Sequence, residues 1–222
     1  MIYKRYMKKI LDLLLAFFGI VALSPVFLIL IICIKMDSKG PVLFKQRRIG
    51  KGKSEFNILK FRTMKIDTPK DTPTHLLQDP ESYITRVGKF MRKTSLDELP
   101  QIINILKGEM SIIGPRPCLW NQYDLIAERD KYGANDIYPG LTGWAQINGR
   151  DELPIDVKAK LDGIYVEKIS FCFDVKCFFG TIISIVKHDG VVEGGTGEMG
   201  KVKETASTEG TVEFQGNERN LG

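Results

Sequence analysis

Two carboxylates stand side by side at Asp97 and Glu98, within the stretch TSLDELPQ at residues 94–101. A carboxylate can attack phosphorus or bind a divalent cation, so this pair could form an active site. The same stretch could also be an ordinary helix start, because Ser95 and Glu98 have the spacing of a capping box before an apolar run. The spacing alone leaves both interpretations open.

Pro100 bears on where that helix begins. Proline has no backbone N–H and is tolerated only among the first helical positions, so a start at Ser95 would place it too deep. We therefore expect a helix that begins near Asp97 and ends at Gly108. The positive end of that helix would then lie at the two carboxylates, where phosphate also binds well.

The composition is ordinary apart from a basic surplus. The chain has 222 residues, 43% of them hydrophobic and 27% charged, with a net charge of +5. A basic body could face nucleic acid, anionic lipid or a phosphorylated substrate. The four cysteines show no CxxC spacing and there are only two histidines, so we expect reduced thiols and no Cys/His metal site.

The apolar segment at residues 10–34 contains one charged residue, Asp12, and is long enough to span a bilayer. Lysine and arginine flank it on both sides, which favours placing both of its ends on the cytoplasmic side. Ser24 and Pro25 interrupt its middle, and proline breaks the helical hydrogen-bond ladder. We predict a re-entrant membrane helix over residues 1–36 that bends at this pair, with a kinked spanning helix as the alternative.

The following segments complete the predicted organisation. Residues 42–64 alternate around a Gly-Lys-Gly-Lys turn and predict a β-hairpin. Residues 65–82 are polar with three prolines and predict a loop, followed by a short basic helix from Thr85 to Arg92. An apolar stripe at residues 175–186 fits either a core helix or a helix in the membrane interface.

The expected fold class is therefore α+β, mostly helical, with a small β-hairpin, the re-entrant helix and interfacial amphipathic helices. A catalytic domain at residues 37–190 would lie on the membrane surface. The segment at 191–222 is rich in glycine and glutamate, and we expect a flexible tail.

Taken in order, the segments resemble one protein family. An apolar segment with a central Ser-Pro is followed by KFRTM, TSLDELPQ, LKGEMSIIGPRP and PGLTGWAQINGR. The chain resembles the small monotopic bacterial phosphoglycosyl transferases, the bacterial sugar transferase family that includes the Campylobacter enzyme of N-linked glycan assembly. The resemblance covers about residues 1–190. It implies transfer of a sugar-1-phosphate from a UDP-sugar to a polyprenyl phosphate, usually undecaprenyl phosphate, with release of UMP.

The resemblance also implies roles for individual residues. Asp97 matches the nucleophile, and Glu98 matches the second carboxylate, which would bind Mg²⁺ or act on the acceptor as a base. Basic residues associated with phosphate binding match Lys60, Arg92 and Arg116. Mg²⁺ would neutralise part of the diphosphate charge, since it prefers carboxylate and phosphate oxygens.

The pair Ser24 and Pro25 matches the bend of the family's re-entrant helix. The expected location is the cytoplasmic face of the inner membrane, in contact with its lipids. Two alternatives remain at this point. The chain could be a non-enzymatic membrane adaptor in which Asp97 and Glu98 only cap a helix, or a transferase that uses a plain hexose donor. A nucleic-acid-binding protein is not expected, because no such motif occurs.

Overall fold

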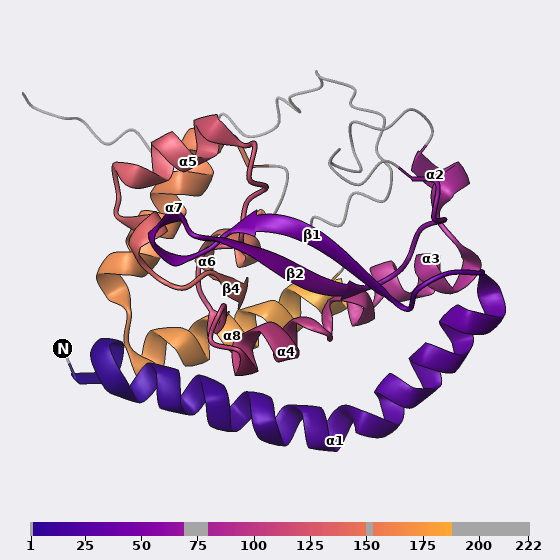
Figure 1. Ribbon diagram of the computed structural model, residues 1–222. Coiled ribbons are helices and arrows are strands. Elements are labelled where there is room, and N and C mark those ends of the chain that lie inside the picture. Colours follow the sequence, from indigo (N-terminus) through magenta and orange to yellow (C-terminus); the bar gives the residue numbers. More distant parts are fainter. Residues whose placement is uncertain (1, 69–79, 150–152, 188–222) are drawn as a thin grey trace, which may run out of the picture.

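The computed structural model describes residues 2–68, 80–149 and 153–187, and helices dominate this part of the chain (Figure 1). The predicted tail at 191–222 and most of the predicted loop at 65–82 lie outside the described residues. The helices are α1 (Lys8–Asp37), α2 (Pro80–Tyr83), α3 (Arg86–Lys93), α4 (Gln101–Leu106), α5 (Tyr123–Asp130), α6 (Trp144–Ile147), α7 (Ile155–Lys168) and α8 (Phe171–Lys187). The strands are β1 (Leu43–Ile49), β2 (Glu55–Phe61), β3 (Ser111–Ile113) and β4 (Gly140–Thr142).

The predicted hairpin is confirmed. Strands β1 and β2 pair antiparallel, with Leu43 opposite Phe61 and Ile49 opposite Glu55. The turn lies in the predicted glycine–lysine cluster, where Gly52 has a φ of +63°, a value that glycine adopts without steric cost. Local alternation and a glycine turn were sufficient to specify this element.

Helix α1 runs without interruption through Pro25 and curves along one edge of the molecule (Figure 1). Because proline has no N–H, Pro25 cannot bond the carbonyl of Val21, four residues earlier. The Ser24 hydroxyl donates to that carbonyl at 2.8 Å instead. The Ser-Pro pair therefore fits within a helix, because the serine satisfies the group that the proline leaves free.

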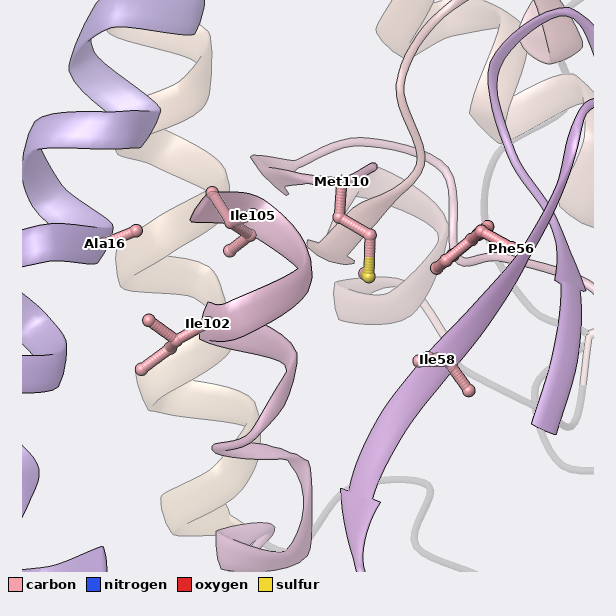
Figure 2. Close-up of a cluster of buried hydrophobic side chains, with 6 residues drawn as sticks. All are labelled: Ala16, Phe56, Ile58, Ile102, Ile105 and Met110. Carbon is pink, nitrogen blue, oxygen red and sulfur yellow. The ribbon is translucent and has the colours of Figure 1, made fainter. Parts of the chain in front are cut away.

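Both halves of α1 pack against the rest of the molecule. Figure 2 shows α4 between α1 and β2, in a cluster of buried side chains at Ala16, Phe56, Ile58, Ile102, Ile105 and Met110. Further along α1, Leu30 and Ile34 pack in a second cluster with Phe61 of β2 and Met91 of α3. The curved helix thus contacts the hairpin side of the fold along most of its length.

The first turns of α1 are also held by polar contacts. Asp12, the one charge in the apolar segment, accepts a hydrogen bond from the Ser111 hydroxyl at 2.6 Å. Lys8 donates to a carboxylate oxygen of Asp174 on α8 at 2.7 Å. Tyr165 of α7 donates to the other oxygen of Asp174, also at 2.7 Å. Burying these charges is tolerated because each has a partner.

The outer face of α1 is apolar and exposed. Leu15, Phe18 and Ile29 are 59%, 64% and 60% exposed. Within the described residues, α1 is the one helix long and apolar enough to cross a membrane. A large exposed apolar surface of this kind marks contact with a membrane or another protein.

The stripe on α8 does not form a core. Phe178, Phe179, Ile182 and Ile183 are all exposed, whereas Cys177 and Ser184 on the other side of the helix are buried. The core interpretation of this stripe is therefore wrong for these four side chains. Contact with the membrane interface stays a prediction.

The predicted helix start near Asp97 is also wrong. Helix α4 begins only at Gln101, after Pro100, and Asp97 lies in a separate 3₁₀ turn at Leu96–Glu98. Ser95 makes no capping hydrogen bond and has a φ of +56°, so the capping-box interpretation fails too. The left-handed backbone at Ser95 turns the chain before α4 and separates the carboxylates from that helix.

Strands β3 and β4 form a short parallel pair that the sequence did not reveal. Their close approach depends on glycine, because a Cβ added at Gly140 would lie 2.1 Å from the backbone nitrogen of Gly114. A glycine at this position lets two backbones meet that any side chain would separate. This contact fixes the chain just before Arg116.

Candidate active site

The 3₁₀ turn at Leu96–Glu98 presents the two carboxylates to one side and is anchored by leucines on the other. Leu96 and Leu99 are three residues apart, so they lie on the same side of the turn. Both pack against the cluster that contains Phe61 and Met91. Because one leucine precedes the carboxylate pair in the chain and the other follows it, their packing fixes the orientation of Asp97 and Glu98.

Glu98 lies at the centre of the polar contacts. Lys60 of β2 donates to its Oε1 at 2.8 Å. Arg116 donates through two nitrogens, to Oε1 at 2.7 Å and to Oε2 at 3.3 Å. Charge-assisted and two-pronged bonds of this kind are strong and directional, so Glu98 orients both cations beside Asp97.

Asp97 is buried, with 8% of the residue exposed. Burial raises the pKa of its carboxyl above the ordinary value. The charge of Lys60 opposes this rise, the Glu98 carboxylate adds to it, and Arg92 and Arg116 oppose it further. Asp97 therefore combines greater basicity than an exposed aspartate with three cations close enough to hold anionic substrate groups.

Glu98 responds in the opposite direction. Burial by itself would raise its pKa, but the charges of Arg116 and Lys60 and the hydrogen bonds that they donate outweigh burial. The pKa of Glu98 consequently lies well below its usual range. This carboxylate is ionised throughout the physiological range and is a weak proton acceptor.

The structure brings together all five predicted polar residues: Asp97, Glu98, Lys60, Arg92 and Arg116. Arg92 comes from the last turn of α3, whose first turn is capped by the Thr85 side chain. The other two cations come from β2 and from the segment after β3. Their catalytic roles remain predictions. Ser24 and Pro25 do not join the cluster but lie within α1. Arg150, the last residue of the segment PGLTGWAQINGR and a further basic residue that could bind phosphate, lies outside the described residues.

Asn104 is a positioning residue that the sequence reasoning missed. Its side chain is fully buried, accepts from the backbone N–H of Leu59 at 2.9 Å and donates to the carbonyl of Asn57 at 2.8 Å. These bonds hold α4 against β2 next to Lys60. The signal was the amide of Asn104 between the isoleucines of the helical run QIINIL, where a polar residue needs a partner.

The segment after Arg116 is tied to the hairpin. Arg48 of β1 donates to the carbonyl of Pro117 at 3.0 Å. The backbone N–H of Ile49 donates to the carbonyl of Cys118 at 3.0 Å. Since β1 pairs with β2, these bonds place Arg116 and Lys60 on one rigid unit.

Gln101 is a buried polar residue that follows the two carboxylates closely in the chain. It lies three residues after Glu98, is fully buried, and neither of its amide atoms has a hydrogen-bond partner within the described residues. Buried amides are nearly always satisfied, so an unsatisfied one near a functional cluster indicates a group that a ligand can bond.

The donor set matches Mg²⁺ in one specific way. The described part of the chain holds no group of three or more His, Cys, Asp or Glu side chains that could enclose a metal ion. Mg²⁺ does not require such a cage, because it is commonly held by one or two carboxylates, substrate phosphates and water. Asp97 and Glu98 can supply such a carboxylate ligand, with a diphosphate completing the set.

The family model for the bacterial sugar transferases matches residues 3–188, so the chain belongs to this family. The match spans every element of the fold described above. It confirms the family that the sequence motifs predicted and identifies the protein as a transferase enzyme. Together with the apolar helix α1, it indicates association with a membrane.

Several curated relatives are similar over most of the chain. An uncharacterized sugar transferase of Bacillus subtilis is 38% identical over 185 residues, covering 83% of this chain and 90% of the relative. The UDP-glucose:undecaprenyl-phosphate glucose-1-phosphate transferase of Escherichia coli is 38% identical over 191 residues, covering 80% of this chain and 40% of the relative. An Aeromonas hydrophila relative, named a UDP-N-acetylgalactosamine-undecaprenyl-phosphate N-acetylgalactosaminephosphotransferase, is 38% identical over 187 residues and is covered to 44%. The chain thus spans less than half the length of these two longer relatives.

Proposed function

We propose that this protein transfers a sugar-1-phosphate from a UDP-sugar to undecaprenyl phosphate or a similar polyprenyl phosphate. The observation that carries the proposal is the arrangement of Asp97, a buried carboxylate, beside Glu98, which holds two cations. The names of the Escherichia coli and Aeromonas hydrophila relatives support the same reaction. Those names differ in the sugar, so the family defines the reaction and leaves the sugar open.

The reaction proceeds in two displacements at one phosphorus atom. In the first, an Asp97 oxygen bonds to the β-phosphorus of the UDP-sugar, and the bridging oxygen leaves with UMP. In the second, an oxygen of the polyprenyl phosphate bonds to the same phosphorus, and the bond to Asp97 breaks. The products are UMP and a polyprenyl-diphosphate sugar, and Asp97 returns to its starting state.

The cations lower the barrier by meeting the negative charge of the substrate. Arg92 and Arg116 offer planar forks of N–H donors that match phosphate oxygens, and Lys60 offers a compact charge. Burial strengthens these interactions because less water screens them. Glu98 holds Arg116 and Lys60 in place before the substrate arrives.

The contacts of Glu98 favour a role in positioning Lys60 and Arg116 over a role as a base. Its lowered pKa makes it a poor acceptor for a proton from the lipid phosphate. The Mg²⁺ ion would be held by Glu98 or Asp97 together with the diphosphate, where it would neutralise developing charge.

Helix α1 would seat the enzyme on the cytoplasmic face of the inner membrane without crossing it. Its 30 residues would reach about 45 Å if straight, enough to cross a hydrocarbon core of about 30 Å. Near one end Lys8 contacts Asp174, and near the other Ile34 packs on Phe61. A helix with both ends on the same domain supports re-entry, with the acceptor phosphate at headgroup level beside the site.

The test measures UMP release by purified protein given a UDP-sugar, Mg²⁺ and undecaprenyl phosphate. We expect Asp97→Asn to lower turnover on the order of a thousandfold, because an amide cannot form the phosphorus bond. Asp124→Asn is the matched control, since Asp124 is an exposed carboxylate in the first turn of α5.

Turnover of Asp97→Asn at the rate of the control would contradict the proposal. The adaptor alternative, in which the carboxylates matter only for the local fold, would instead require that the wild-type protein itself release no UMP. That alternative already conflicts with the structure at one point, because the N-cap of α4 is Pro100 and neither carboxylate caps this helix with a side-chain hydrogen bond.

A further inference from the structure

A cavity of about 380 Å³ lies beside the first turns of α1, away from the candidate active site. Its walls include Ile105 and Met110, at and beyond the end of α4, whereas Asp97 precedes the start of that helix. None of the five polar residues of the candidate active site lines it. The cavity is therefore a separate feature of the molecule.

The cavity gathers positive charge. Four lysines line it, against two aspartates: Lys4, Lys8, Lys9 and Lys51, with Asp12 and Asp136. Lys8 and Asp12 are already engaged, by Asp174 and by Ser111. The remaining positive charge of the cavity is carried by lysines from distant parts of the chain, which are Lys4, Lys9 and Lys51.

Lys9 and Lys51 meet at one aromatic ring. Their ammonium groups lie 5.8 Å and 4.7 Å from the centre of the Tyr138 ring. Neither makes an ion pair with any described residue, and both line the cavity. Both side chains are exposed, so each ammonium group stays accessible to an anionic partner in addition to its contact with the ring.

The cavity is also partly apolar. Leu13 of α1, Ile105 and Ile169 contribute to its walls. On the neighbouring surface of α1, Ile10 and Leu14 are 57% and 49% exposed. A site with ammonium groups beside apolar walls, next to an exposed apolar helix, matches a molecule with an anionic head and a hydrocarbon tail.

We propose that this cavity binds the phosphate group of a membrane lipid, with Lys9, Lys51 and Tyr138 as its principal contacts. The inference rests on the proposed membrane seat of α1, which would place these lysines at the level of the headgroups. It does not depend on the phosphotransfer chemistry at Asp97. A lipid phosphate held here would anchor the start of α1 and set the depth of the enzyme in the membrane.

The test measures lipid selectivity in mixed micelles that contain equal amounts of fluorescent phosphatidylglycerol and fluorescent phosphatidylcholine. The full chain is captured on an affinity resin, and the ratio of the two lipids bound to it is measured. We expect Lys9→Gln with Lys51→Gln to lower the enrichment of phosphatidylglycerol about fivefold or more. Lys45→Gln with Lys160→Gln is the control, because it removes the same charge from two exposed lysines outside the cavity.

Equal losses of phosphatidylglycerol enrichment in the two double variants would overturn the proposal. They would indicate only that an anionic lipid is attracted to a positively charged protein. Unchanged enrichment in the cavity variant would overturn it too. Tyr138→Leu provides a second variant that keeps every charge, and a loss of enrichment there supports the specific site. Asp97→Asn should keep full enrichment, so failure of the proposed reaction and failure of this site give different results.

Two competitors identify the source of the phosphate. If undecaprenyl phosphate displaces phosphatidylglycerol from the wild type, the lipid phosphate held in the cavity is that of the carrier. Persistence of phosphatidylglycerol assigns the cavity to phospholipid. Displacement by millimolar inorganic phosphate alone would contradict recognition of a lipid.

Discussion

Asp97 and Glu98 are neighbours in the chain, yet their surroundings shift their pKa values in opposite directions. Asp97 is buried, with cations near but no direct ion pair to any residue in the described part of the chain, and its pKa is raised. Glu98 is clasped by Lys60 and Arg116, and its pKa is lowered. Two carboxylates held at different basicity can take different roles in one reaction, and the roles that we propose here are nucleophile for Asp97 and organiser of charge for Glu98.

The pH dependence of the reaction should reveal this arrangement. Asp97 attacks only when ionised, so kcat/KM should fall as the pH drops through the pKa of Asp97. Lys60 lowers that pKa, and Lys60→Gln should therefore move the acidic limb of the pH profile to higher pH. The measurement is kcat/KM for UMP release across the acidic range. The result is the pH at which kcat/KM falls, because a loss of rate by the same factor at every pH does not move the limb.

The control for this experiment is Lys45→Gln, on the exposed face of the neighbouring strand β1. It should leave the acidic limb in place. An unmoved limb in Lys60→Gln, or a shift to lower pH, would show that Lys60 does not act on the ionisation of Asp97.

For single residues, the sequence indicated which side chains belong to the candidate site but not which of them contact one another. The motifs and the resemblance pointed to Asp97, Glu98 and the three basic residues. Nothing in the spacing of Lys60 and Glu98, which are 38 residues apart, predicted a bond of 2.8 Å between them. Asn104, which holds the elements that carry them, was not predicted at all.

Among the elements, the parallel pair of β3 and β4 has the largest effect on the site. Gly114 precedes Pro115 and Arg116, and a Cβ added there would lie 2.6 Å from the carbonyl oxygen of Tyr138. This contact leaves no room for a side chain at the position that aims Arg116.

Gly114→Ala should therefore destabilise the fold and weaken catalysis together. We expect a loss of about 1–3 kcal/mol in the free energy of unfolding, typical of overpacking, and a fall in kcat/KM because Arg116 moves. Denaturation in detergent and UMP release measure the two effects. Gly19→Ala is the control, since its added Cβ would have only Ile102 nearby, at 4.0 Å; equal behaviour of the two variants would refute the role of this contact.

The elements that the sequence predicted well are those specified by local pattern. The hairpin follows from alternation and a glycine turn, and the helix from Arg86 follows from a threonine cap. The start of α4 was missed because a left-handed φ at Ser95 is not encoded by residue type. Strands β3 and β4 were missed because three-residue strands paired across the chain leave no periodic signal.

For the whole molecule, the main consequence of the fold is that both ends of α1 are attached to the same domain. Asp12 and Lys8 secure its beginning to β3 and α8. Near its end, the Arg62 guanidinium donates to the carbonyl of Ser38 at 2.8 Å. The basic flanks and the Ser-Pro pair predicted a bend, whereas the polar contacts that secure both ends depend on distant residues.

Cysteine labelling tests this topology. In a variant without native cysteines, Lys4→Cys, Lys39→Cys and Asp124→Cys each introduce one exposed thiol, at the two ends of α1 and on α5. A membrane-impermeant maleimide should label all three thiols in inverted vesicles. It should label none of them in intact cells whose outer layers let the reagent reach the periplasmic face of the inner membrane. Labelling of Lys4→Cys from the periplasmic side would show that α1 spans the membrane.

The covalent step at Asp97 is the central claim, and trapping it is the most direct test. Purified protein is incubated with Mg²⁺ and sugar-labelled UDP-sugars, the glucose, galactose and N-acetylated forms in turn, with no acceptor lipid present. The covalent mechanism predicts that one donor leaves a phosphosugar on the peptide containing Asp97, with release of an equal amount of UMP and no adduct on Asp97→Asn. Release of UMP without labelled protein, or an adduct that persists in Asp97→Asn, would contradict it.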